Sequence, residues 1–154
     1  MNKVYEKVSK NIEDTRQIAI LFVDKVIKRG SKKALIVGLS GDLGVGKTSF
    51  TQMVSKYLGI KKRVNSPTFV IMKKYPIKYM QYRFLFHLDA YRLKNEKELL
   101  HLGWKEILEN KENLVLIEWP ENTKKAMPKD SVLINIFHTE EGHRSFKIKK
   151  TKMV

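Results

Sequence analysis

The chain has 154 residues, of which 42% are hydrophobic, and it contains no cysteine. This length suits one well-filled domain and excludes two ordinary ones, so we predict a single domain over residues 1–154. The lack of cysteine excludes disulfides and thiolate metal sites. Since no segment has the pattern of a secretory signal or of a membrane span, we expect a cytoplasmic protein that does not engage a membrane.

Formal net charge is +15, from 31 lysines and arginines against 16 acidic residues. Such an excess is typical of proteins that meet nucleic acid or an acidic partner. The lysines are spread along the chain, however, and they outnumber the arginines that base readout and bidentate phosphate binding favour. The charge therefore leaves two interpretations open, general solvation and a true electrostatic role.

The first predicted element is an amphipathic helix. Its apolar positions recur at helical spacing, a capping residue precedes them and a glycine follows. The stripe comprises Ile12, Thr15, Ile18, Ala19, Phe22 and Val26, the candidate caps are Ser9 and Asn11, and Gly30 ends the helix. A buried strand at residues 34–37 and a helix at residues 48–58 are predicted next.

The segment between that strand and that helix carries the most informative motif. Residues 41–48 read GDLGVGKT and fit G-x-x-x-x-G-K-[ST], the phosphate-binding loop of nucleoside triphosphatases. Glycines let backbone N–H groups turn toward one concavity, and the following helix directs its positive end there. Lys47 is expected to reach the outer phosphates and the Thr48 hydroxyl to hold Mg²⁺. The motif predicts binding of a nucleoside triphosphate.

A candidate switch segment and a hairpin follow the loop helix. Ser66, Pro67 and Thr68 lie where switch loops of such proteins lie, and the two hydroxyls can approach a γ-phosphate or its metal. A plain polar turn is the alternative. Residues 69–75 are predicted as a strand ended by Pro76, and residues 82–88 as its antiparallel partner across a loop at 77–81.

The remaining elements complete a small α/β domain. Short helices are predicted from Asn95 and over residues 102–108, then a buried parallel strand over 113–119. A connecting segment between two prolines leads to a closing hairpin of residues 132–137 and 145–148, with the basic tail from Lys147 as a strand end that runs into a frayed terminus. We predict a central mixed, partly parallel sheet flanked by helices.

A phosphate loop requires an acidic side chain that holds the magnesium ion or orients the attacking water, and two carboxylates are candidates for this role. Glu118 ends an apolar strand that should lie beside the loop strand, and because Asp is usual there, Glu118 would act through a water. Asp89 also ends an apolar stretch, and could instead cap the following turn. His87 is interpreted as a packed, hydrogen-bonded strand histidine rather than a proton shuttle. Arg92 is either a charge-stabilising finger or, as we favour, a brace for a neighbouring carboxylate.

Trp119, beside the Glu118 carboxylate, also has two interpretations. It could cover the nucleotide or pack against Pro120, and packing is the commoner fate of a tryptophan.

Four motifs occur in this order: GDLGVGKT at 41–48, SPTF at 66–69, HLDAYR at 87–92 and IEWPE at 117–121. Together they resemble the TsaE family, the bacterial ATPase of tRNA threonylcarbamoyladenosine biosynthesis, over nearly the whole chain. The resemblance implies a P-loop NTPase fold, Mg²⁺-dependent ATP binding and slow hydrolysis. It also implies docking onto the TsaB–TsaD heterodimer, which modifies an adenosine beside the tRNA anticodon, so that tRNA is met indirectly through the complex.

The resemblance also assigns roles to individual residues. ATP is held by Gly44, Val45, Gly46, Lys47, Thr48 and Ser49, with an early contact from Thr15; Mg²⁺ is held by Thr48 and Glu118; Lys47, Asp89 and Glu118 support hydrolysis; and Ser66, Pro67 and Thr68 form the switch. Val45 departs from the family, which usually has Ala there. We expect the added bulk to be tolerated because the side chain should point outward.

Three other functions were weighed against this one. A small-molecule or nucleotide kinase needs an arginine-rich lid, yet Arg144 is the only arginine after Glu118. A GTPase needs an Asn-Lys-x-Asp signature, which the chain lacks. A non-catalytic module that binds tRNA directly fits the charge, but no RNA-binding aromatic motif accompanies the lysines. The sequence therefore favours an ATPase subunit, with the kinase as the alternative.

Overall fold

The computed structural model describes residues 3–28, 32–67 and 69–150, so Gly30 and Thr68 lie outside the described residues. Within these ranges the elements are β1 (Lys3–Ser9), α1 (Ile12–Lys25), β2 (Leu35–Ser40), α2 (Lys47–Tyr57), β3 (Met72–Tyr79), β4 (Tyr82–Asp89), α3 (Glu96–Leu100), α4 (Trp104–Glu109), β5 (Asn113–Glu118), the 3₁₀ helix η1 (Pro120–Ala126), β6 (Val132–His138) and β7 (Arg144–Lys150). None of the helices in these ranges is long and apolar enough to cross a membrane.

The described strands form one mixed sheet in the order β1-β7-β6-β2-β5-β4-β3. Its centre is parallel, because β2 lies between β6 and β5, and β4 continues beyond β5 in the same direction. Both flanks are antiparallel, with β7 between β1 and β6 and with β3 on β4. The predicted α/β fold with a mixed, partly parallel sheet is confirmed.

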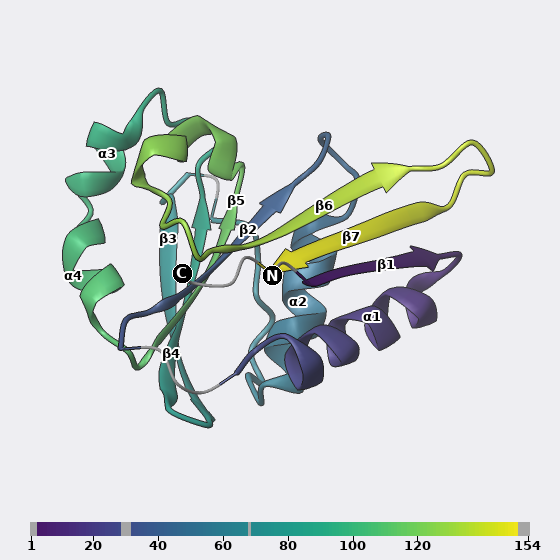
Figure 1. Cartoon of the computed structure of the whole chain (residues 1–154), viewed down its shortest axis with the longest axis horizontal. Helices are drawn as coiled ribbons and strands as arrows, with labels where there is room; N and C mark the ends of the chain where they lie inside the picture. Colours follow the sequence, from purple (N-terminus) through teal and green to yellow (C-terminus); the bar gives the residue numbers. More distant parts are fainter. Residues whose placement is uncertain (1–2, 29–31, 68, 151–154) are drawn as a thin grey trace.

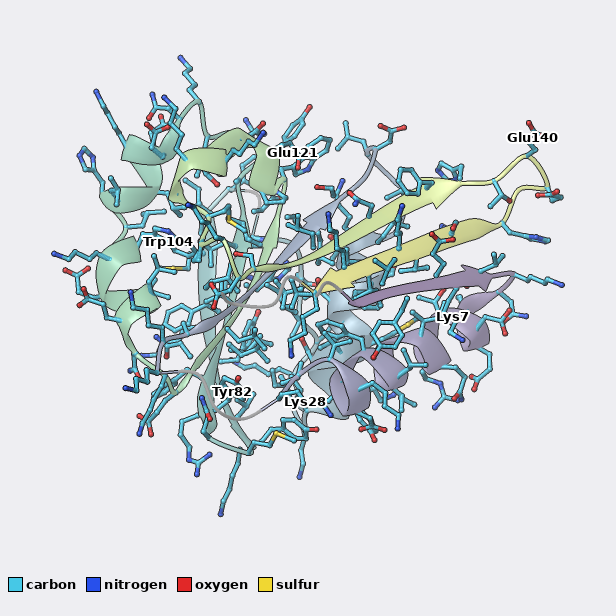
Figure 2. All side chains as sticks on the ribbon, viewed as in Figure 1. Lys7, Lys28, Tyr82, Trp104, Glu121 and Glu140 are labelled. Atoms are coloured by element: carbon cyan, nitrogen blue, oxygen red, sulfur yellow. The ribbon has the colours of Figure 1, made fainter. Side chains whose placement is uncertain are left out.

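Helices cover both faces of this sheet, as Figure 1 shows. On one face, α1 and α2 pack over alternate strand residues such as Val37 and Leu116. On the other, α3 and α4 pack over the residues between them, such as Ile36 and Val115, around the fully buried Trp104 (Figure 2). This alternation is what period-two side-chain geometry requires of a strand buried on both faces.

The structure selects Asn11 as the cap of α1, because its side chain accepts a hydrogen bond from the Asp14 N–H at 2.8 Å. Ser9, the other candidate, is the last residue of β1. That strand was not predicted, since its alternation of charged and apolar residues over seven positions is weak. It is fixed by pairing with β7, a partner about 140 residues further along the chain.

The predicted bounds of the first hairpin strand are wrong. The strand begins at Met72, not residue 69, and it continues through Pro76 to Tyr79. Proline is tolerated there because β3 is an edge strand, and the register shifts between Pro76 and Tyr79. Residues 69–71 instead turn, with the Ile71 N–H donating to the Pro67 carbonyl at 2.6 Å.

The basic stretch from Lys147 is also more ordered than predicted. Lys147 pairs with Glu6 of β1 on one side and with Asn135 of β6 on the other. The strand therefore runs to Lys150 in the interior of the sheet, because β1 supplies the second partner that the sequence did not reveal.

Candidate functional site

The site lies at the carboxyl ends of the central parallel strands. The loop of residues 41–46 joins β2 to α2, and the last residues of the two neighbouring strands, Asp89 and Glu118, pair with each other in register. Leu39 of β2 is in turn opposite Glu118. The two carboxylates that the sequence offered as competitors therefore lie side by side beside the loop.

The loop depends on glycine at positions where no other residue fits. Gly46 has φ +112°, and a Cβ there would lie 2.7 Å from Nη1 of Arg144. Gly41 has φ +154°, and a Cβ there would lie 2.6 Å from the carbonyl oxygen of Ile136. The backbone is thus folded tightly between β6, β7 and the start of α2, in a conformation that L side chains rarely adopt.

Lys47 begins α2 and is almost completely buried. Its ammonium donates to the backbone carbonyl of Gly41 and, at 3.3 Å, to that of Asp42. It also lies 3.9 Å from the centroid of the Trp119 ring. Burial lowers the pKa of Lys47, while four nearby carboxylates, Glu118 foremost, oppose this shift. The Lys47 side chain thus lies at the centre of the loop, between two loop carbonyls and the Trp119 ring.

Glu118 is held from two sides. Its Oε2 lies 2.7 Å from Nε2 of the fully buried His87, and both of its carboxylate oxygens lie 3.3 Å from Oγ1 of Thr48. His87 is thus the packed, hydrogen-bonded strand histidine that the sequence analysis favoured. By fixing one oxygen, it orients the carboxylate toward the first turn of α2.

Thr48 and Glu118 suit a magnesium ion chemically, because both offer oxygen donors, the ligands that Mg²⁺ prefers. Over the described ranges, no three or more His, Asp or Glu side chains gather in a way that could hold a metal. A magnesium ion bound here would therefore need further oxygen ligands from phosphates and water, and magnesium sites in proteins usually include such ligands.

Asp89 connects the switch segment to this carboxylate pair. Its Oδ2 accepts a hydrogen bond from the Ser66 hydroxyl at 3.1 Å, and its Oδ1 accepts one from the Tyr91 N–H at 3.0 Å. Asp89 therefore does cap the turn after β4, and it also lines the same hollow as Glu118. Pro67 is buried beside Ser66, and its carbonyl accepts from Ile71, whose φ of +69° is unusual for a β-branched residue.

Trp119 packs against the core on the α3–α4 face of the sheet and also lies over Lys47 of the loop. It is half-buried, adopts a left-handed backbone conformation with φ +61°, and its ring lies 5.1 Å from that of Tyr91. Pro120 packs elsewhere, against Gly38, where a Cβ would approach Pro120 to 2.9 Å. The ring therefore packs against the core, as the sequence analysis favoured, and coverage of a nucleotide stays a prediction.

Two hollows adjoin at the loop. The first, which we call the loop hollow, has a volume of about 340 Å³ and is lined by Leu43, Gly44, Gly46, Lys47, Thr48, Ser49, Ser66, Asp89, Tyr91, Glu118, Trp119 and Arg144. The second, the side hollow, has a volume of about 520 Å³ and lies between the start of α1, α2 and the β6–β7 turn. Ser49 and Arg144 line both.

Thr15 lines the side hollow, not the loop hollow. It is buried, and its hydroxyl lies 2.6 Å from that of Ser9. The contact of Thr15 with a nucleotide therefore stays a prediction that concerns the second hollow.

Arg144 is the residue that sequence reasoning missed. It starts β7, 98 residues beyond Gly46, yet its guanidinium lies against that glycine. The sequence analysis used Arg144 only as evidence against a lid. Arg144 reaches the loop because β7 pairs with β6, and no local sequence pattern predicts which strand β7 will pair with.

Two expectations about single residues are wrong. Val45 does not point outward, because it is buried and packs in the core on the α1–α2 face of the sheet. Gly44 and Gly46, both with positive φ, flank Val45 and turn the chain at this point. Arg92 is exposed, its guanidinium lies 5.0 Å from the Phe69 ring centroid, and within the described ranges it forms no ion pair with a carboxylate, so a cation–π contact stands where a carboxylate was expected.

The chain is similar to known proteins over most of its length. The family model described as threonylcarbamoyl adenosine biosynthesis protein TsaE matches residues 9–146. The tRNA threonylcarbamoyladenosine biosynthesis protein TsaE of Haemophilus influenzae is 31% identical over 86% of this chain and 81% of that protein. That of Bacillus subtilis is 34% identical over 87% and 78%.

A solved structure agrees with these relatives. The crystal structure of YdiB from Bacillus subtilis superposes with a TM-score of 0.77 and 28% identity, covering 99% of this chain and 88% of that one. Fold, motif order and sequence similarity agree, and the chain belongs to the TsaE family.

Proposed function

We propose that this protein binds ATP with Mg²⁺, hydrolyses it slowly, and serves tRNA threonylcarbamoyladenosine biosynthesis by acting on the TsaB–TsaD heterodimer. The relatives with that printed role share most of the chain. The observation that carries the ATPase part is the junction of Lys47, Thr48, Asp89 and Glu118 in one hollow.

The charges and the shape of the two hollows favour a nucleoside polyphosphate. The loop hollow offers the buried ammonium of Lys47 and the first turn of α2, which suit the phosphate tail. The side hollow is larger and would take the nucleoside, with Ser49 and Arg144 at the junction. On this assignment, Thr15 contributes to the nucleoside side and residues 44–49 to the phosphate side.

The roles in hydrolysis follow from the contacts. Mg²⁺ bound between Thr48 and Glu118 supplies charge neutralisation on the phosphates when it is present. Lys47 stabilises negative charge on the outer phosphates. Asp89, which is held by the Tyr91 N–H, orients the attacking water or accepts a proton from it. Ser66 exchanges its bond to Asp89 for the γ-phosphate, which makes residues 66–68 the switch.

A direct test measures ATP binding and turnover by the purified chain, with and without the TsaB–TsaD heterodimer. We expect binding that depends on Mg²⁺, slow turnover by the chain alone, and a pull-down of the heterodimer that changes with ATP. The absence of nucleotide binding under all these conditions would end the proposal. Transfer of labelled γ-phosphate to nucleosides or small alcohols would favour a kinase instead.

A further inference from the structure

Besides the loop hollow and the side hollow, the described residues line two further hollows near the end of α2. Two hollows of about 840 and 630 Å³ adjoin between the end of α2 and the edge strand β3, and they share the segment from Gly59 to Arg63. We call them together the basic hollow. We propose that the basic hollow binds the phosphodiester backbone of RNA, an inference that rests on the proposed role in tRNA modification.

Charge in the basic hollow is of one sign. Six of its lining residues are cations and none is Asp or Glu. The cations are Lys56, Lys61, Lys62, Arg63, Lys73 and Lys74. In the part of the chain that the structure describes, none of the six belongs to an ion pair. Concave walls lined by one sign of charge focus the electric field and raise the local concentration of a polyanion.

Local structure explains how these cations come together. Gly59, with φ +97°, ends α2 and turns the chain, and the Gln52 amide anchors the following segment by donating to the Val64 carbonyl at 2.7 Å. Lys61, Lys62 and Arg63 are exposed along that segment. Opposite them, β3 contributes Lys73. The neighbouring Lys74 also lines the hollow, but its ammonium lies 4.0 Å from the centroid of the Phe84 ring, which packs on the α3–α4 face of the sheet. Edge strands often carry lysine to prevent pairing, which accounts for the β3 residues but not for three consecutive cations in the loop.

The lining favours RNA over a protein partner. Protein interfaces are anchored by exposed aromatic or aliphatic side chains and are depleted in lysine. Ile60, Val64 and Tyr75 of the basic hollow are buried, Pro76 is its exposed apolar residue, and none of the large exposed hydrophobic side chains in the described ranges is among its lining. No exposed aromatic ring is available there for base stacking either. The surface therefore matches phosphates, read without sequence preference.

The basic hollow is also continuous with the proposed nucleotide site. Gln52 and Lys56 of α2 line both the basic hollow and the side hollow. The segment that carries Lys61 to Arg63 leads directly to Ser66, which contacts Asp89. RNA bound here would therefore lie one helix away from the nucleotide.

The test is fluorescence anisotropy of a labelled, unmodified tRNA transcript with the full chain, titrated at several salt concentrations. We expect the triple substitution Lys61→Ala, Lys62→Ala and Arg63→Ala to weaken binding about tenfold or more at low salt, and to reduce the salt slope by about two to three. A matched control replaces three exposed cations elsewhere, Lys124→Ala, Lys125→Ala and Lys129→Ala, and should leave most of the affinity and slope.

Three outcomes would overturn the proposal. They are salt-insensitive or absent tRNA binding by the unaltered chain, an equal loss in the control triple, and displacement of tRNA by polyglutamate of matched charge. ATP turnover and circular dichroism are measured on all variants. If ATP binding fails while tRNA binding stands, the ATPase assignment is lost and the RNA surface remains.

Discussion

Three charged side chains that are distant in the sequence meet in the loop hollow. Lys47 comes from the start of α2, Asp89 from the end of β4 and Glu118 from the end of β5. Each is nearly buried, and each is held by a specific partner rather than left in solvent. Buried charges that face one hollow are costly to a fold, so their convergence marks a candidate functional site.

Substitution of the lysine and of the glutamate should separate binding from hydrolysis. We expect Lys47→Ala to weaken ATP binding by about a hundredfold or more, because it removes a desolvated cation from the phosphates. Glu118→Ala should lower kcat about a hundredfold with a much smaller effect on affinity. Calorimetry and single-turnover hydrolysis measure the two effects, with exposed Lys111→Ala and Glu109→Ala as controls. Wild-type turnover in both variants would refute the site assignment.

Arg144 should contribute to nucleotide binding although it lies 98 residues beyond Gly46 in the sequence. Its guanidinium is at the junction of the loop and side hollows. We expect Arg144→Ala to weaken ATP and ADP binding about tenfold or more, and Arg144→Lys to restore part of it, since charge but not the planar fork is kept. Arg83→Ala, an exposed arginine at the opposite end of β4, is the control. Unchanged affinity for both nucleotides in Arg144→Ala would exclude this role.

The position of α2 over the sheet depends on an aromatic cluster. The Phe50 ring lies 5.8 Å from Phe22 of α1 and 5.4 Å from Phe146 of β7, and all three side chains are fully buried. We expect Phe50→Ala to lower the free energy of unfolding by about 3–5 kcal/mol, and Phe50→Leu by clearly less. Urea unfolding measures both. A loss below about 1 kcal/mol in Phe50→Ala would contradict this packing.

Tyr82 of β4 ties the sheet to the end of α1. Its hydroxyl donates to the Lys28 carbonyl at 2.8 Å, and the two residues lie close together in Figure 2. Burial raises the pKa of Tyr82 to about 12, against about 10 for a free tyrosine. The unfolded chain therefore ionises first, so the stability that Tyr82 contributes is complete below about pH 10 and is lost as the pH rises through its folded value.

Replacement of this tyrosine should test both statements. Tyr82→Phe should cost about 1 kcal/mol at neutral pH through the lost hydrogen bond, and should make the free energy of unfolding fall less steeply between about pH 10 and pH 12. Urea midpoints at pH 8 and pH 11 provide the measurement. Identical pH dependence in the two proteins would contradict the assignment.

Net charge acts on the molecule as a whole. A formal charge of +15 in 154 residues makes the folded state repel itself. We expect the thermal midpoint to rise by several degrees as ionic strength increases from about 0.02 to 0.2 M, because the Debye length then falls below the spacing of surface charges. Differential scanning fluorimetry in NaCl provides the measurement. A midpoint that stays flat or falls with salt would show that the charges are already locally compensated.

Local patterns in the sequence were enough to predict the glycine-rich loop of residues 41–48, the amphipathic α1, the hairpin of β3 and β4, and the buried parallel strand β5. These features depend on neighbours in the chain, through glycine spacing, helical and strand periodicity, and capping residues. The motif order also identified the family, and the two carboxylates at strand ends followed from their position after apolar runs.

The way in which distant segments meet became visible only in the three-dimensional fold. The fold paired β1 with β7, which ordered the basic stretch from Lys147, and it carried β3 through Pro76 because an edge strand needs no donor there. It turned Val45 inward, brought Trp119 over Lys47 and placed Arg144 against Gly46. Such contacts join residues with large separations along the chain, and the free energy that selects them comes from burial and pairing across the sheet, which no local pattern encodes.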